Sequence, residues 1–126
     1  MSRILVVDDD PLVGKALFRL LRREGFDVRV APDGATALAL LDDFAPDLVL
    51  SDQRMPGMTG AELLAQVGRR LPRARRVLLS GDAVPGAVAE YGGGVPLVTK
   101  PWEDGPLLAI LRGALAALER REGDVS

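Results

Sequence analysis

The sequence predicts one α/β domain in which a doubly wound sheet of five parallel strands alternates with five helices. Three observations lead to this fold class. Short apolar runs recur along the chain, and several are continuously apolar, as strands buried on both faces are. Segments with apolar residues at helical spacing separate these runs. No long linker, internal repeat or low-complexity tract interrupts the alternation.

The first half of the chain holds three of the expected strands and two of the helices. Asp10 and Pro11 are the N-cap and first residue typical of a helix start, and Gly25 is a stop signal. Asp33 can cap the second helix in the same way. The expected elements are a strand at 3–7, a helix at 11–24, a strand at 26–31, a helix at 34–44 and a strand at 48–52.

The second half carries the remaining strands and helices. Thr59, followed three residues later by Glu62, is the capping-box signature of a helix start. The expected elements are a helix from 60, a strand at 76–80, a short helix at 84–91, a strand at 95–99 and a last helix from 103–104 to 121. The domain therefore spans 1–121, and we expect 122–126 to be a frayed tail.

The composition fits one globular domain and excludes several classes of protein. Of 126 residues, 48% are apolar and 27% are charged, as in ordinary globular proteins. A net charge of -2 gives no general attraction to nucleic acid or to an anionic membrane. The chain has no cysteine and no histidine, so a zinc site is not expected. No apolar run reaches the about 18 residues of a transmembrane helix, and the first residues do not resemble a signal peptide. We expect a cytoplasmic protein.

Charged and polar side chains follow four of the predicted strands, at the point where each strand ends. Asp8 and Asp9 follow the first strand, Asp52 ends the third, Ser80 ends the fourth and Lys100 follows the fifth. Because the carboxyl ends of parallel strands share one edge, where open α/β sheets bind their ligands, we expect these side chains to gather there.

Such a cluster suits phosphoryl transfer. Neighbouring carboxylates repel one another unless a cation compensates, and Mg²⁺ is a hard ion that prefers oxygen ligands. A carboxylate beside Mg²⁺ can accept a phosphoryl group as an acyl phosphate, which makes Asp52 the expected reacting residue. The ammonium of Lys100 and the hydroxyl of Ser80 can stabilise the phosphoryl oxygens.

The sequence also resembles the receiver domain of bacterial two-component response regulators. The resemblance covers nearly the whole chain through the motifs ILVVDDDP, LVLSDQRMPGMTG, VLLSG and VTKPW, in the family's order. It implies a flavodoxin-like fold and phosphorylation of Asp52 by a partner histidine kinase or phosphotransfer protein. It implies that Asp9, Asp52 and the backbone carbonyl of Arg54 bind Mg²⁺, with Asp8 assisting through water.

The same resemblance implies how the phosphorylated state is read out. Ser80 and Lys100 contact the phosphoryl group, and the Lys100–Pro101 peptide is cis. The domain catalyses its own phosphorylation and dephosphorylation but is no metabolic enzyme. It switches contacts with a downstream protein or an attached output domain, contacts neither nucleic acid nor membrane directly, and could form a homodimer.

One feature departs from the family pattern, and another adds to this interpretation. Leu97 stands where the family usually has a Tyr or Phe that partners the switch hydroxyl, here Ser80. Arg54 and Asp82 lie two residues after Asp52 and Ser80, respectively, so both should stand at the rim of the pocket. We expect them to pair across its mouth, or Arg54 to contact the phosphoryl group, and so to prolong the phosphorylated state.

Two alternatives remain open from sequence. The Asp8-x-Asp10 spacing imitates the nucleophile motif of haloacid dehalogenase-type phosphatases, which would make Asp8 the covalent residue. The chain could also be a receiver that binds its partner constitutively and is never phosphorylated.

Five arginines from Arg69 to Arg76 invite a nucleic-acid interpretation, but without interleaved aromatic residues they fit a solvated turn better.

Overall fold

The structure is a computed structural model that describes residues 1–81 and 95–124. In these ranges it contains five strands and four helices. In chain order they are β1 (Arg3–Val7), α1 (Pro11–Arg23), β2 (Asp27–Ala31), α2 (Gly34–Phe44), β3 (Leu48–Asp52), α3 (Gly60–Arg70), β4 (Arg75–Ser80), β5 (Leu97–Thr99) and α4 (Asp104–Asp124). The short helix predicted at 84–91 lies outside the described residues.

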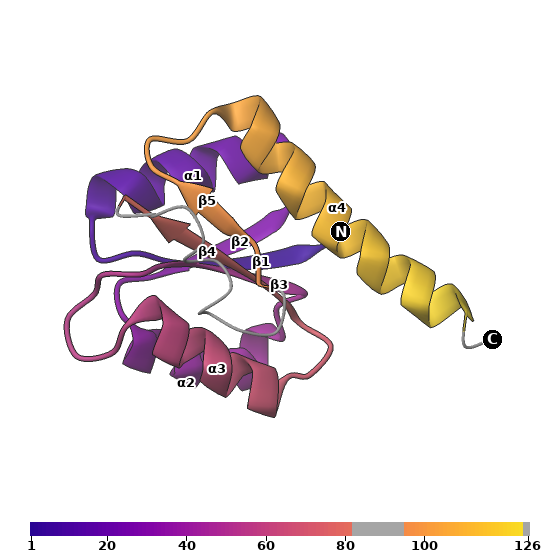
Figure 1. Cartoon of the computed structure of the whole chain (residues 1–126), viewed down its shortest axis with the longest axis horizontal. Coiled ribbons are helices and arrows are strands. Elements are labelled where there is room, and N and C mark those ends of the chain that lie inside the picture. The colour runs from indigo at the N-terminus through magenta and orange to yellow at the C-terminus, as the bar shows by residue number, and fades with distance from the viewer. Residues whose placement is uncertain (82–94, 125–126) are drawn as a thin grey trace.

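The five strands form one parallel sheet in the order β2-β1-β3-β4-β5. Figure 1 shows α1 and α4 on one face of this sheet and α2 and α3 on the other. The sheet is therefore doubly wound, as the sequence predicts. The strand order reverses at β1, which lies between β2 and β3, and ligand sites of such sheets lie at this switch point, beyond the carboxyl ends of the strands.

Two apolar layers hold the helices on the sheet. One layer joins alternate residues of the strands to α1 and α4, with Leu17, Leu21 and Leu111 fully buried. The other joins the remaining strand residues to α2 and α3. All five residues of β3 are buried, which fits a central strand covered on both faces.

Local signals set the helix starts where the sequence places them. The side chain of Asp10 accepts a hydrogen bond from the backbone N–H of Leu12, and Asp33 accepts one from the N–H of Thr36. Thr59 and Glu62 form the predicted capping box. Each cap satisfies an N–H that has no partner within the first turn of its helix.

Five boundaries differ from the prediction. Helix α1 ends one residue earlier than predicted, at Arg23, and β2 begins one residue later, at Asp27. Strand β4 begins one residue earlier, at Arg75, and β5 begins at Leu97, two residues later than predicted. Pro96 has no N–H to give to the sheet, although its carbonyl still accepts a bond from Leu78. Helix α4 continues to Asp124, three residues beyond the predicted end. No helix within the described ranges is both long and apolar enough to cross a membrane.

Candidate functional site

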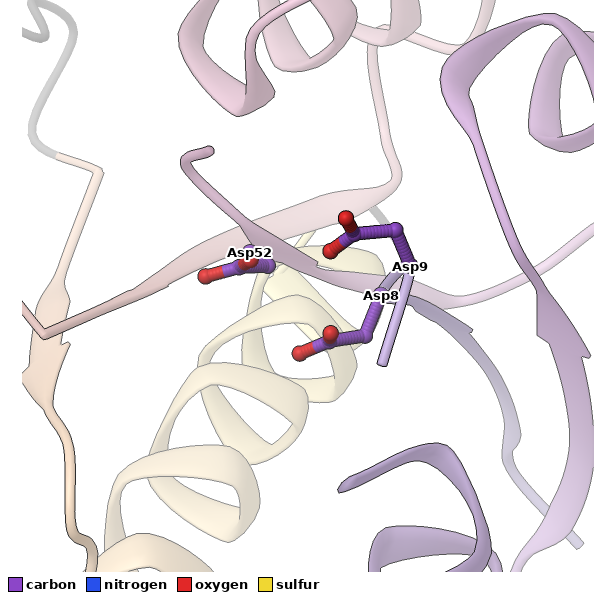
Figure 2. Close-up of side chains that lie close together, drawn as sticks. All are labelled: Asp8, Asp9 and Asp52. Carbon is purple, nitrogen blue, oxygen red and sulfur yellow. The ribbon is translucent and has the colours of Figure 1, made fainter. Parts of the chain in front are cut away.

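The acidic residues predicted to meet at the sheet edge do so. One carboxylate oxygen each of Asp8, Asp9 and Asp52 lies within 4.8 Å of the others. Figure 2 shows the three side chains projecting from the ends of two neighbouring strands toward the same side. Asp8 and Asp52 are buried, whereas Asp9 is exposed. The cluster therefore has a buried floor and an open, solvent-facing side.

Lys100 joins the cluster from the end of β5, at the edge of the sheet. Its Nζ lies 3.1 Å from Oδ2 of Asp8 and 3.1 Å from Oδ1 of Asp52. Its backbone N–H donates to the carbonyl of Ser80, which holds the segment after β5 against the end of β4. The Lys100–Pro101 peptide is cis, as the family resemblance implies. One ammonium thus partly neutralises two buried carboxylates.

The surroundings shift the pKa of both partners. Burial raises the pKa of Asp52 and outweighs the hydrogen bond from Lys100, which acts to lower it; the charge of Asp8 adds to the increase. Burial acts to lower the pKa of Lys100, but its bonds to Asp8 and Asp52, together with their charges, outweigh burial and raise it. Lys100 is therefore charged at neutral pH, and a further cation beside Asp52 would favour the ionised form of its carboxyl group.

The main chain fixes Asp8 at the end of β1. Its backbone N–H donates to the carbonyl of Ala31, beyond the last paired residues of β1 and β2. Its Oδ1 accepts a bond from the N–H of Asp10, which itself caps α1. With Oδ1 bonded to the backbone, Oδ2 faces Lys100. Asp8 is thus a fixed part of the site and not a surface acid.

A cleft of about 620 Å³ opens beside the acidic cluster. Its lining comes from the end of β4, the acidic cluster and the loop that joins β3 to α3. The lining residues are Asp9, Gln53, Arg54, Met55, Pro56, Thr59 and Ser80. Ser80 is only 4% exposed, so its side chain lies at the wall of the cleft and not on an open surface. A small anionic group could enter here next to Asp52.

Gln53, the residue after Asp52, holds the two ends of the loop between β3 and α3 together through hydrogen bonds. The carbonyl of Gln53 accepts a bond from Gly60, and its Oε1 accepts one from Ala61. Gly60 leaves no room for a side chain, because a Cβ there would lie 2.1 Å from the carbonyl oxygen of Asp52. Sequence patterns predict a turn here and give no role to Gln53. The one available signal was a polar residue directly after the expected acceptor.

The other predicted site residues have mixed outcomes. Arg54 is exposed and lines the cleft, whereas Asp82 lies outside the described residues, so the pairing across the pocket mouth stays a prediction. Leu97 is half-buried, pairs with Leu78 in the sheet and packs on the α2–α3 side. Leu97 is thus a half-buried aliphatic residue at the position where the family resemblance implies an aromatic ring.

The donor set fits a magnesium ion. The cluster offers three carboxylates and neither nitrogen nor sulfur, and oxygen-only sets suit Mg²⁺. Oxygens within 4.8 Å of one another can share one ion with small side-chain movements or through a bound water. Two of the three acids are buried and share the single charge of Lys100, which leaves negative charge for the ion to balance.

Comparisons with known proteins agree with this geometry. A family model described as response regulator receiver domain matches residues 4–112. The chain is 39% identical over 125 residues to the DNA-binding response regulator MtrA of Mycolicibacterium smegmatis, and 34% identical to the sensory transduction protein RegX3 of Mycobacterium tuberculosis. Both matches cover 98% of this chain and 53% of the relative. The chain thus spans about half the length of these relatives.

Solved structures give the same result. A CheY-like receiver domain protein from Methanospirillum hungatei has a TM-score of 0.87 at 27% identity, and the match covers 96% of this chain and 98% of that one. The response regulator TrrA from Thermotoga maritima, solved in complex with Mg²⁺-BeF, has a TM-score of 0.82 at 28% identity over 90% of this chain and 99% of that one. These matches give no support to the phosphatase alternative. The chain belongs to the response regulator receiver domain family, whose members work in phosphorylation-based two-component signalling.

Proposed function

We propose that Asp52 is the phosphoacceptor of this receiver domain and that its phosphorylation depends on Mg²⁺. One observation carries the proposal: the Asp52 carboxylate lies at the carboxyl edge of the sheet with Lys100 at 3.1 Å and with oxygens of Asp8 and Asp9 within 4.8 Å. Asp9 and Asp52 with the Arg54 carbonyl would hold the ion, and Asp8 would assist through water. The magnesium-bound relative TrrA supports this choice of metal.

The reaction needs few groups, and the chain supplies them. A carboxylate oxygen of Asp52 attacks phosphorus while the bond from phosphorus to the donor's imidazole nitrogen breaks, and that nitrogen keeps the electron pair. Asp9, Asp52 and the Arg54 carbonyl would hold a Mg²⁺ that would supply positive charge for the phosphoryl oxygens. Lys100 Nζ, already directed at Asp52, can pair with one oxygen, and the Ser80 hydroxyl at the cleft wall can donate to another. Dephosphorylation is a separate hydrolysis: a water oxygen attacks phosphorus while the bond from phosphorus to the Asp52 oxygen breaks. The Asp52 carboxylate keeps the electron pair, and the water gives up a proton as inorganic phosphate leaves.

The donor and the target are other proteins or domains. The chain has no histidine, so a phosphohistidine donor belongs to a kinase or phosphotransfer protein. We propose that the product switches contacts with a downstream protein or an attached output domain, and that a homodimer could form. Relatives named as DNA-binding are about twice as long as the matched region, and our proposal that this region does not contact nucleic acid concerns the receiver alone.

The test is phosphorylation by acetyl phosphate with and without Mg²⁺, followed by mass mapping of the modified residue. We expect one phosphoryl group on Asp52, formed only with Mg²⁺ and absent in Asp52→Asn. Lys100→Met should slow labelling by about 100-fold or more, because it removes a preorganised charge at the reacting group. Lys15→Met, which removes the other lysine of the chain from an exposed position, should not.

Two results would contradict the proposal. Labelling of Asp8 would favour the phosphatase chemistry. Absence of any label with the wild-type chain, together with an unchanged affinity for a binding partner in the presence of acetyl phosphate, would favour a receiver that binds constitutively.

A further inference from the structure

Gln53 makes three hydrogen bonds from a position directly after Asp52. Its backbone N–H donates to the carbonyl of Leu79 at 3.1 Å, which extends the pairing of β3 with β4 by one bond. Its backbone carbonyl accepts from the N–H of Gly60 at 2.9 Å, and its side-chain Oε1 accepts from the N–H of Ala61 at 2.8 Å. The side chain thus reaches across the loop to the helix that follows it.

These bonds complete the start of α3. The first N–H groups of a helix have no partner within the helix and need one from outside. Glu62 donates to the Thr59 side chain, but Gly60 and Ala61 both donate to Gln53. The Thr59 cap therefore serves only one of the first three N–H groups. Without the Gln53 side chain, the N–H of Ala61 would lose the partner that the structure gives it.

The same bonds define the loop that faces the phosphoryl cleft. Residues 54–59 form the loop between Gln53 and the start of α3, and the bonds from Gly60 and Ala61 to Gln53 hold the two ends of this loop together. The first and last residues of the loop, Arg54 and Thr59, both line the cleft. Gly60 packs closely against the carbonyl group of Asp52, so the start of α3 contacts the backbone of the proposed phosphoacceptor. A shift of α3 away from Gln53 would carry the loop, and with it Arg54, relative to Asp52.

We propose that Gln53 is a positioning residue for the magnesium site. Its side chain holds the start of α3 against the end of β3, and this contact keeps Arg54 beside the acidic cluster, where its carbonyl can serve the ion. The inference rests on the proposed function of Asp52. Side-chain length matters, because Asn is one methylene shorter and cannot span the same gap, whereas Glu places a carboxylate oxygen where Gln places Oε1.

The test compares Gln53→Met, which keeps length but removes the acceptor, with Gln53→Glu, which restores it. Gln66→Met is the matched control, because Gln66 also lies in α3 but its side chain donates to the sulfur of Met58. Amide hydrogen exchange of Ala61 by NMR reports the bond directly, and calorimetric titration with Mg²⁺ reports the ion site. Gln53→Asn is a second variant that replaces Gln53→Met if that variant does not fold. Its shorter side chain cannot reach the N–H of Ala61, so we expect the same effects on exchange and on Mg²⁺ affinity.

We expect Gln53→Met to speed exchange at Ala61 by about fivefold or more, since one hydrogen bond is lost. It should raise the Mg²⁺ dissociation constant about tenfold, as loss of a group that orients metal ligands does. Gln53→Glu should restore slow exchange at Ala61 and return the Mg²⁺ dissociation constant to the wild-type value or below it, because its carboxylate adds negative charge beside the ion site. Gln66→Met should change neither value. Unchanged exchange in Gln53→Met overturns the contact, and faster exchange with unchanged Mg²⁺ affinity overturns the positioning role. Failure of the proposed function would look different: the wild-type chain itself would bind no Mg²⁺ and carry no label on Asp52.

Discussion

At the scale of single residues, the site depends on a balance between burial and charge. Asp8 and Asp52 are buried, and a buried carboxylate without compensation is costly. Lys100 compensates both, yet the pKa of Asp52 still stands above its ordinary value because of burial. Within the described residues, the acidic cluster thus sets three carboxylates against the one ammonium of Lys100, a deficit of positive charge. This deficit favours the binding of a divalent cation.

Asp9 and Asp10 offer a matched test of metal binding. Both are exposed acids in adjacent positions, but only Asp9 belongs to the cluster, while Asp10 caps α1. Mg²⁺ at 100 times its dissociation constant should raise the free energy of unfolding of the wild type by about 2.7 kcal/mol. Asp9→Asn should lose most of this gain. Asp10→Asn should keep it, because Asn also caps helices well. Urea denaturation with Mg²⁺ and with EDTA measures both, and equal losses in the two variants would show that bulk charge alone attracts the ion.

The sequence predicts the role of a residue where its hydrogen-bond partner lies close to it along the chain. Asp10, Asp33 and Thr59 act as caps as predicted, because each partner lies two or three residues away. Gln53 escapes prediction because its partner Ala61 is eight residues away, across a loop whose path no local pattern defines. A glutamine also has no strong preference that would mark it for this role.

At the scale of elements, β3 and α3 act together on the acceptor. The strand delivers Asp52 to the sheet edge, and the helix start lies directly on the carbonyl of that residue. The sequence predicts both elements and the capping box of the helix, since each follows from local periodicity and capping. It does not predict how closely the two meet, because the close contact depends on the absence of a side chain at Gly60. Glycine is also common at helix starts for other reasons, so its presence at position 60 does not by itself indicate a close contact.

Gly60 and Gly113 test this close contact as a pair. In Gly60→Ala the new Cβ would lie 2.1 Å from the Asp52 carbonyl oxygen and 2.9 Å from Leu78, so backbone has to move. We expect a loss of about 1–3 kcal/mol in the free energy of unfolding and slower labelling of Asp52. Gly113 lies in α4 and is exposed, and a Cβ added there would meet no atom within 4 Å. Gly113→Ala should stabilise the fold by about 0.5–1 kcal/mol. Urea denaturation measures both changes. If both variants gain stability, the contact at Gly60 is looser than the structure gives.

At the scale of the whole molecule, the sheet order brings distant parts of the chain together. Asp8, Asp52 and Lys100 come from the ends of β1, β3 and β5, and Lys100 crosses the end of β4 to reach them. That these residues share an edge follows from parallel strands, so the sequence predicts it. That the ammonium contacts both carboxylates at the same distance depends on the strand order and the side-chain path. The spacing of the motifs predicts neither the strand order nor the path of the Lys100 side chain.

Lys100 should therefore stabilise the fold as well as serve the chemistry. Removing one member of a buried charge cluster leaves the others uncompensated, so in EDTA at about pH 7 Lys100→Met should lose about 3 kcal/mol in the free energy of unfolding. The pKa of Lys100 is higher in the folded chain than its ordinary value of 10.5. The folded state thus holds this proton more tightly, so its contribution is complete below pH 10.5 and is lost as pH rises through the folded-state pKa.

The difference in stability between wild type and Lys100→Met should accordingly shrink above pH 10.5 and stay constant below it. Urea denaturation of both chains from about pH 7 to about pH 11.5 measures this difference, and other groups that titrate there cancel in the comparison. Lys15→Met provides the control, because it removes the other lysine of the chain from an exposed position and should change the free energy of unfolding little. A difference that stays constant to the highest pH would mean that the ammonium of Lys100 does not link the three strands in the folded chain.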